Sequence, residues 1–127
     1  MANQEIKSSK VPAAIGPYSQ GIKAGNTVYV SGQIGTLPET GEFAGTDIKS
    51  QTKQSLTNIK NILAEAGYTM SDVVKTTVYL KDFTDFAAMN EVYAGFFTEP
   101  YPARAAFQVV VLPKGGIVEI EAVAFRG

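Results

Sequence analysis

Short β-branched and aromatic runs alternate along the chain with two longer segments of helical spacing. Apolar side chains recur every three or four residues in the second half of segment 47–66, and Gly67 follows where a helix would end. A second segment, from about residue 84 to 97, carries an apolar stripe rich in aromatics, as is typical of a helix that packs on a core. The pattern predicts two helices separated by strands.

Four runs rich in β-branched and aromatic residues have the composition of strands. The predicted strands are 27–31, 73–80, 104–111 and 117–125. Apolar residues lie on both faces of the last two strands, but two helices can cover only one face of a sheet. We therefore expect an α/β (α+β) fold in one domain, residues 1–127, with a half-apolar sheet face that serves as an interface in a homo-oligomer.

Composition narrows the possible chemistry. The chain has no Cys and no His, which excludes thiolate nucleophiles, disulfides and every catalytic triad that uses histidine. Glu, Asp, Lys, Tyr, backbone dipoles and bound water remain, as does a carboxylate-only site for a hard cation. With 11 Lys and Arg against 12 Asp and Glu, a net charge of −1 argues against nucleic-acid binding. The polar N-terminus and apolar runs of at most four residues predict a soluble, cytoplasmic protein with no membrane partner.

Arg104 is one of two arginines and opens a strand rich in Ala, Phe and Val. A guanidinium in apolar surroundings needs a partner. It either grips a carboxylate or phosphate with both arms or forms an ion pair with an acidic side chain. Arg126, beside the C-terminus, is interpreted as a surface charge.

Glu119 and Glu121 lie two residues apart, so they share one face of the last predicted strand. Either carboxylate could act as a base or orient a water molecule. The alternative is a rim position or an ion pair, with Lys75 as the expected partner. If the last two strands formed a simple hairpin, Arg104 would lie about five residues, or ~16 Å, from Glu119. Either these strands are not hairpin neighbours, or a site combines residues of two subunits.

Three further positions admit a functional and a structural interpretation. Gly32, after Ser31, could let a ligand approach the backbone, or could be a turn or bulge glycine. Tyr18, in the turn 15–20, could be a mobile lid or could simply pack its turn. Asn90 interrupts the aromatic stripe and either faces solvent or binds a ligand.

Seven motifs together resemble those of the reactive intermediate deaminase family, the RidA or YjgF proteins. They are Ala13-Ala14-Ile15-Gly16-Pro17-Tyr18-Ser19-Gln20, Ser31-Gly32-Gln33-Ile34, Gln54-Ser55-Leu56-Thr57-Asn58, Val74-Lys75-Thr76-Thr77-Val78-Tyr79, Asn90-Glu91-Val92-Tyr93, Pro102-Ala103-Arg104, and Leu112-Pro113-Lys114 followed by Glu119-Ile120-Glu121-Ala122. The resemblance implies a chorismate-mutase-like fold, a mixed sheet with two helices on one face, and a homotrimer with three intersubunit clefts. It also puts the last strand inside the sheet, which would remove the distance problem.

The activity that the resemblance implies is hydrolysis of 2-enamine and 2-imine acids to 2-oxo acids and ammonia, without metal or cofactor. One such substrate is 2-aminoacrylate, which escapes from PLP-dependent dehydratases. Arg104 would hold the substrate carboxylate with help from the backbone at Gly32, and Glu119 would position the attacking water. The other cleft residues would be Tyr18, Ser31 and Asn90. Ala105-Ala106 replaces a Ser-Cys pair common in the family, which would remove a thiol from the cleft wall.

Two other functions stay open at this stage. The same cleft could sense a 2-oxo acid or other metabolite without catalysis and signal to a protein partner. An RNA-cleaving translation inhibitor, an activity also ascribed to the family, fits less well with the net charge and the lack of histidine. A deaminase of larger imines is a further variant, which the cleft volume would decide.

Overall fold

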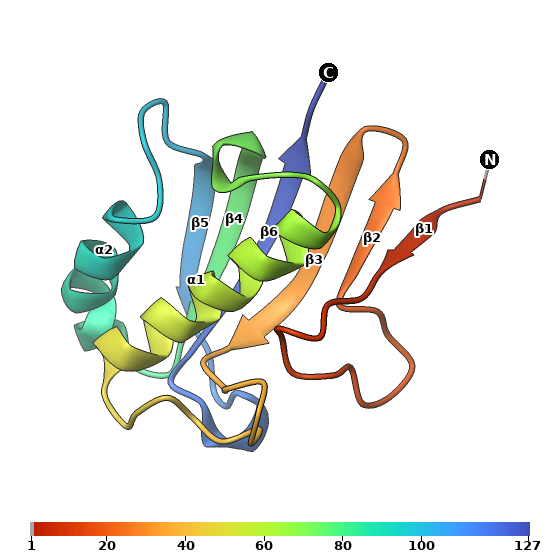
Figure 1. The fold of residues 1–127 in the computed structure, drawn as a ribbon. Helices are drawn as coiled ribbons and strands as arrows, with labels where there is room; N and C mark the ends of the chain where they lie inside the picture. Colours follow the sequence, from red (N-terminus) through yellow and green to blue (C-terminus); the bar gives the residue numbers. More distant parts are fainter. Residues whose placement is uncertain (1) are drawn as a thin grey trace.

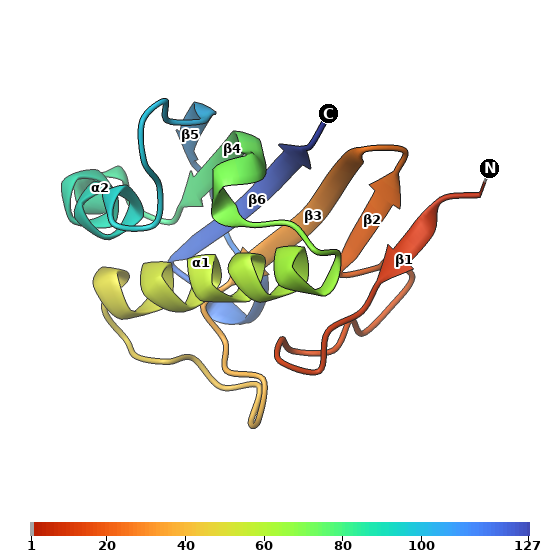
Figure 2. The same ribbon diagram turned by 45° about the horizontal axis from the view of Figure 1, so that its top comes forward.

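The computed structural model describes residues 2–127. The strands are β1 (Gln4–Ile6), β2 (Gly21–Ala24), β3 (Thr27–Ile34), β4 (Val73–Leu80), β5 (Ala103–Gln108) and β6 (Val118–Phe125). The helices are α1 (Ile48–Glu65) and α2 (Phe86–Ala94), and 3₁₀ turns occur at Met70–Asp72, Phe83–Asp85 and Pro113–Gly115. Figure 1 shows one sheet with both helices on the same face, and Figure 2 shows this layering from a second angle. The prediction of two helices covering one sheet face is confirmed.

The strand order is β1-β2-β3-β6-β4-β5. β6 lies between β3 and β4 and is antiparallel to both, whereas β4 and β5 are parallel, so the sheet is mixed. The last two strands are therefore not hairpin neighbours, because β4 separates them. A parallel neighbour needs a crossover connection, which α2 and the segment after it supply between β4 and β5.

The elements differ from the sequence prediction in several places. β3 runs to Ile34 and not only to residue 31, because its pairing with β6 resumes after a register shift between Val30 and Gln33. The N-terminal strands β1 and β2 were not predicted, because they are short and contain few β-branched residues. β5 ends at Gln108 and not at residue 111: its partner β4 ends at Leu80, and the amide of Val109 makes the last bond to the Leu80 carbonyl. α2 ends at Ala94 and not at residue 97, because the chain tightens into i−3 hydrogen bonds there.

The core lies between the sheet and the helices. The fully buried apolar side chains of α1 are Leu56, Ile59, Ile62 and Leu63. They pack on the inward-facing residues of the central strands, among them Val28, Val78 and Ile120. The other face of the sheet is uncovered, and Tyr29, Phe107 and Phe125 on it are each about half exposed. This is the half-apolar open face that the alternation predicts.

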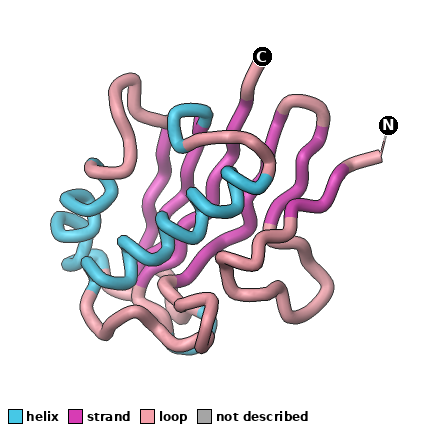
Figure 3. The backbone as a smooth tube through the Cα atoms, in the orientation of Figure 1, coloured by secondary structure: helices cyan, strands magenta, loops and turns pink. Residues whose placement is uncertain are grey.

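A polar row on α1 fixes the end of β3. Ser55 Oγ donates to the Gln33 carbonyl at 2.6 Å, and Asn58 Nδ2 donates to the Thr36 carbonyl at 3.0 Å. Helix and strand also approach closely at Gly35, where a β-carbon would lie 2.6 Å from the α-carbon of Gln51. Loops 7–20, 35–47 and 109–117 gather beyond this strand end, as Figure 3 shows. The end of β3 is thus held rigidly beside three loops.

Candidate functional site

The predicted site residues lie in two separate cavities. One, of about 360 Å³, is bounded by Tyr18, Gly32 and Glu119, together with Lys114. The other, of about 430 Å³, is bounded by Asn90 and Arg104. The first lies at the end of β3 and β6 among the loops, and the second lies between α2 and the start of β5. Each cavity therefore holds only part of the predicted set.

Arg104 is positioned by α2. Its Nη1 donates to Asn90 Oδ1 at 2.7 Å, and the guanidinium carbon lies 4.8 Å from the centre of the Tyr93 ring and 5.4 Å from that of Phe86. Tyr93 is itself fixed by a 2.7 Å hydrogen bond between its hydroxyl and Thr76 Oγ1, on the strand next to β5. Aromatic faces and a neutral amide oxygen thus hold the guanidinium in place.

No acidic side chain within residues 2–127 forms an ion pair with Arg104; the ion pairs there are Lys49–Glu91 and Arg126–Asp72. The interpretation of Arg104 as one partner of a structural ion pair therefore does not hold within the protomer. Its remaining donors suit a planar carboxylate. Arg126 is exposed, as the interpretation of a surface charge predicts, and it also binds Asp72 at 2.7 Å and lies over Tyr68.

Glu119 lies against the backbone of β3. The pairing of β3 and β6 shifts by one residue between Val30 and Gln33, which leaves a bulge at Ser31 and Gly32. A β-carbon on Gly32 would lie 2.8 Å from Glu119 Cδ and closer still to Oε2, so only glycine leaves room for this carboxylate. Burial, and then the charge of Glu121, raise the pKa of Glu119 above its usual value. A carboxylate with a raised pKa is a stronger base.

Ser31 ties the Tyr18 loop to β3. Its hydroxyl donates to the Ser19 carbonyl at 2.6 Å, and its amide donates to the Gln20 carbonyl at 2.9 Å. The Ser31 side chain therefore holds the loop and does not bound the cavity that its neighbour Gly32 bounds. The Tyr18 side chain is 54% exposed. Its ring is therefore held in place only through the backbone of the loop that Ser31 binds.

Arg104 and Glu119 point to opposite faces of the sheet. In the β4 register Arg104 pairs with Thr76, whose side chain is buried under the helices, whereas Glu119 pairs with Tyr79, an odd number of residues further on. Two strand spacings and three residues also separate them, about 10 Å in each direction. The interior position of β6 therefore does not bring the two residues together, contrary to the expectation. One protomer cannot offer both to one small ligand.

One other expectation needs correction. Lys75 forms no ion pair with either glutamate within residues 2–127; instead the Tyr79 hydroxyl donates to Glu121 Oε1. Ala106, at the position of the common cysteine, packs against the core and bounds neither cavity of the protomer. Its expected effect on the wall of an intersubunit cleft stays a prediction.

Sequence reasoning missed three contributors to these cavities. Tyr93 and Phe86 were assigned only to the core, and nothing in their spacing distinguishes a core aromatic from a support for Arg104. Lys114 turns the chain with a left-handed φ of 58° and bounds the Glu119 cavity. The only sign of this role in the sequence is the position of Lys114 in the motif Leu112-Pro113-Lys114, before the last strand.

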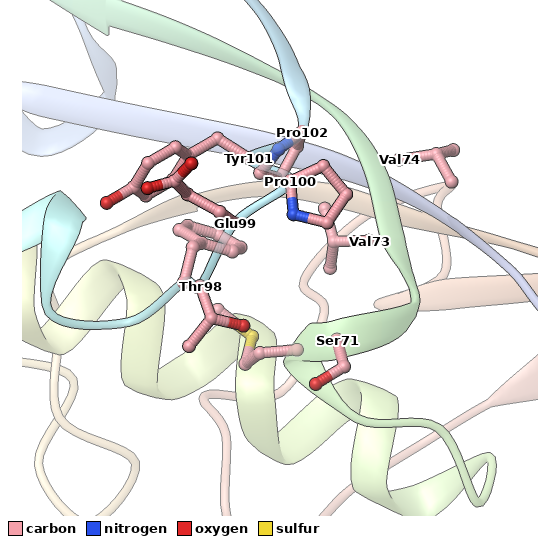
Figure 4. A pocket seen from close by; sticks show the side chains of 10 residues that line it. Ser71, Val73, Val74, Thr98, Glu99, Pro100, Tyr101 and Pro102 are labelled. Carbon is pink, nitrogen blue, oxygen red and sulfur yellow. The ribbon is translucent and has the colours of Figure 1, made fainter.

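A third cavity, of about 350 Å³, lies beneath segment 97–102 (Figure 4). Tyr101 and Pro102 also border the Arg104 cavity. Figure 4 shows the Glu99 and Tyr101 side chains pointing the same way, away from Val73. No basic side chain lines this cavity, so it is unsuited to a carboxylate. Within residues 2–127 there is no group of three metal-binding side chains, and neither helix there has the length and apolarity to cross a membrane.

Comparisons with known proteins identify the family. Residues 8–126 match the family model described as Endoribonuclease L-PSP. A RutC family protein of Pyrococcus abyssi is 56% identical over 126 residues, 99% of both chains. The 2-iminobutanoate/2-iminopropanoate deaminase of Capra hircus is 51% identical over 122 residues, 96% of this chain and 89% of that protein.

Among solved structures, E. coli TdcF with bound serine has a TM-score of 0.93 and 45% identity, covering 98% of this chain and 99% of that one. Family model, relatives and structure all extend over nearly the whole chain, and they agree with the motifs read from the sequence. The chain belongs to the RidA/YjgF family, whose family model is that of Endoribonuclease L-PSP.

Proposed function

We propose that this protein is an enzyme that hydrolyses 2-imino acids and their enamine tautomers, such as 2-aminoacrylate, to 2-oxo acids and ammonia. The observation that carries the proposal is the Arg104 guanidinium, held by Asn90 and two aromatic rings and without an acidic partner in residues 2–127. Relatives that are half identical are named as deaminases of such imines, and TdcF holds serine, a small amino acid with the same carboxylate. We keep the expectation of a cytoplasmic protein.

The active unit in this proposal is a homotrimer. The two partial sites face different sides of one sheet, and the half-apolar open face is uncovered in the protomer. A head-to-tail contact that closes after three copies would bury that face and repeat one cleft three times. Each cleft would take Arg104 and Asn90 from one subunit and Tyr18, Gly32 and Glu119 from the next.

The hydrolysis needs orientation, a water molecule and a path for protons. Arg104 binds the substrate carboxylate and fixes the imine carbon beside it. Glu119 accepts a proton from water as the oxygen attacks that carbon, and passes the proton to the nitrogen, which gives a carbinolamine. The C–N bond then breaks: Glu119 takes the hydroxyl proton and passes it to the amine nitrogen, which leaves with the bonding electron pair as ammonia, and Glu119 is a carboxylate again. One imine and one water become one 2-oxo acid and one ammonia. Tyr18 would cover the cleft as a lid.

A coupled assay tests the proposal directly. A serine dehydratase generates 2-aminoacrylate, and pyruvate formation is followed with and without this protein. We expect faster pyruvate release with the wild type. If release stays at the uncatalysed rate while the protein still binds 2-oxobutyrate, it is a metabolite sensor and not a deaminase. RNA cleavage in a parallel sample, with unchanged pyruvate release, would support the nuclease interpretation.

Gly32→Ala should lower kcat/KM about 10–100-fold, because the added β-carbon displaces the Glu119 carboxylate and a shift of about 1 Å at a reacting group can cost this much. The measurement is steady-state kinetics in the coupled assay, with circular dichroism to verify folding. Lys60→Ala is the control: Lys60 is exposed on α1 and bounds neither cavity. Equal activity of the two variants would contradict the placement of Glu119.

A further inference from the structure

The two glutamates on β6 differ in their surroundings. Glu121 Oε1 accepts a hydrogen bond from the Tyr79 hydroxyl, whereas Glu119 accepts none from residues 2–127. In the register of β4 and β6, Tyr79 lies opposite Glu119 and Thr77 lies opposite Glu121. The Tyr79 side chain therefore starts beside Glu119 and reaches diagonally to Glu121, a contact within the range of cross-strand neighbours. The Tyr79 side chain thus connects the position opposite Glu119 to the Glu121 carboxylate.

The Tyr79 phenol stays protonated and so remains a hydrogen-bond donor. The pKa of Tyr79 is raised to about 12, first by its hydrogen bond to Glu121 and then by burial, so it keeps its proton throughout neutral pH. The Glu121 carboxylate is held by this bond on the same strand face as Glu119. Its charge is one of the two causes that raise the pKa of Glu119. Geometry and electrostatics thus link the three side chains.

We propose that Tyr79 and Glu121 are positioning residues for Glu119: the phenol anchors the second carboxylate beside the first, which keeps Glu119 a strong enough base to take a proton from water. The inference rests on the proposed role of Glu119. Neither Tyr79 nor Glu121 bounds the cavities of Glu119 and Arg104, so both act through Glu119 and not on the substrate.

Other charged or titratable groups face this cluster. Lys75 of β4 pairs with Val123 and so points to the same face, as does Tyr29 of β3. Lys114 shares the cavity of Glu119, but its ammonium lies near the turn at Gly41, where a β-carbon would be 3.8 Å from Nζ. The pKa of Glu119 is nonetheless raised, by burial and then by the charge of Glu121.

The test compares Glu121→Gln, Tyr79→Phe and the control Tyr29→Phe in the assembled protein. Carbon-13 NMR of glutamate carboxyls, with the Glu119 signal assigned from its absence in Glu119→Gln, gives the pKa of Glu119 without reference to activity. The dependence of kcat/KM on pH gives the pKa of the same group in the working enzyme. Size-exclusion chromatography verifies that every variant keeps the oligomeric state of the wild type.

We expect Glu121→Gln to move the pKa of Glu119 and the acid limb of kcat/KM to lower pH by about half a unit, which is about threefold in rate on that limb. Tyr79→Phe should move both in the same direction by less, and Tyr29→Phe should move neither. Unchanged NMR values in both test variants would overturn the inference. If the pKa of Glu119 shifts in NMR but the acid limb of kcat/KM does not, Glu121 is coupled to Glu119, but Glu119 is not the base in the reaction. That outcome would also overturn the inference, because it rests on the role of Glu119 as the base.

Discussion

Arg104→Ala should lower kcat/KM for 2-aminoacrylate about 10²–10³-fold, which is about 3–4 kcal/mol, because truncating one partner of a hydrogen-bonded charge pair costs about 2–5 kcal/mol. The guanidinium is preformed for this task, since Asn90 and the rings of Tyr93 and Phe86 hold it before any ligand arrives. Because the Arg104 guanidinium is already ordered, little binding energy is lost on ordering it when the substrate binds. The coupled assay gives kcat/KM, and calorimetry with 2-oxobutyrate gives the loss of affinity.

Two further variants sharpen this prediction. Arg104→Lys keeps the charge but not the two-armed fork, so it should recover only part of the activity. Arg126→Ala removes the other arginine, whose partner is Asp72, and should behave as the wild type in the assay. Activity of Arg104→Ala within threefold of the wild type would show that the substrate carboxylate binds elsewhere.

Glu119→Gln should lower kcat about 10²–10⁴-fold, the usual contribution of a general base, while KM changes little. Glutamine fills the same space beside Gly32 but cannot accept the proton. The surface variant Glu91→Gln, which loses only its contact with Lys49, is the matched control. Full activity of Glu119→Gln would assign water activation to another group, and lost binding of 2-oxobutyrate would assign Glu119 to binding.

The pH dependence of the wild type follows from the same residue. Glu119 acts as a base only when ionised, so kcat/KM should fall about tenfold per pH unit below its pKa. Because burial and Glu121 raise that pKa, the decline should begin at a higher pH than for an ordinary glutamate. The Glu119→Gln variant should show no such fall of kcat/KM at acidic pH.

Much of the fold follows from periodicity, and the exceptions have physical causes. The spacing of Leu56, Ile59 and Leu63 is enough to place α1 and its buried face. The short strands β1 and β2 carry little intrinsic strand preference: β2 forms by pairing with β3, and β1 by pairing with β2. Val110 and Val111 have strand-like side chains but no partner, because β4 has already ended; they are 91% and 70% exposed.

The site illustrates a different limit. Alternation within one strand shows which of its residues share a face, as for Glu119 and Glu121. It cannot show whether a residue of β5 and a residue of β6 share a face, because that depends on their register with β4. Only the pairing of Arg104 with Thr76, and of Glu119 with Tyr79, reveals the opposite faces. Likewise, the contact of Gly32 with Glu119 depends on a bulge that no residue pattern fixes.

The central claim is that the site is divided between two subunits of the proposed homotrimer, and mixed oligomers of two variants test it most directly. Arg104→Ala and Glu119→Gln, each inactive alone, are unfolded together in equal amounts and refolded, with subunit exchange verified by mass spectrometry of differently tagged chains. If each cleft takes one residue from each of two subunits, about one quarter of the clefts are intact after random mixing. Our account predicts recovery of about a quarter of wild-type activity. Mixed trimers as inactive as their parents would place both residues in a cleft of one subunit and contradict it.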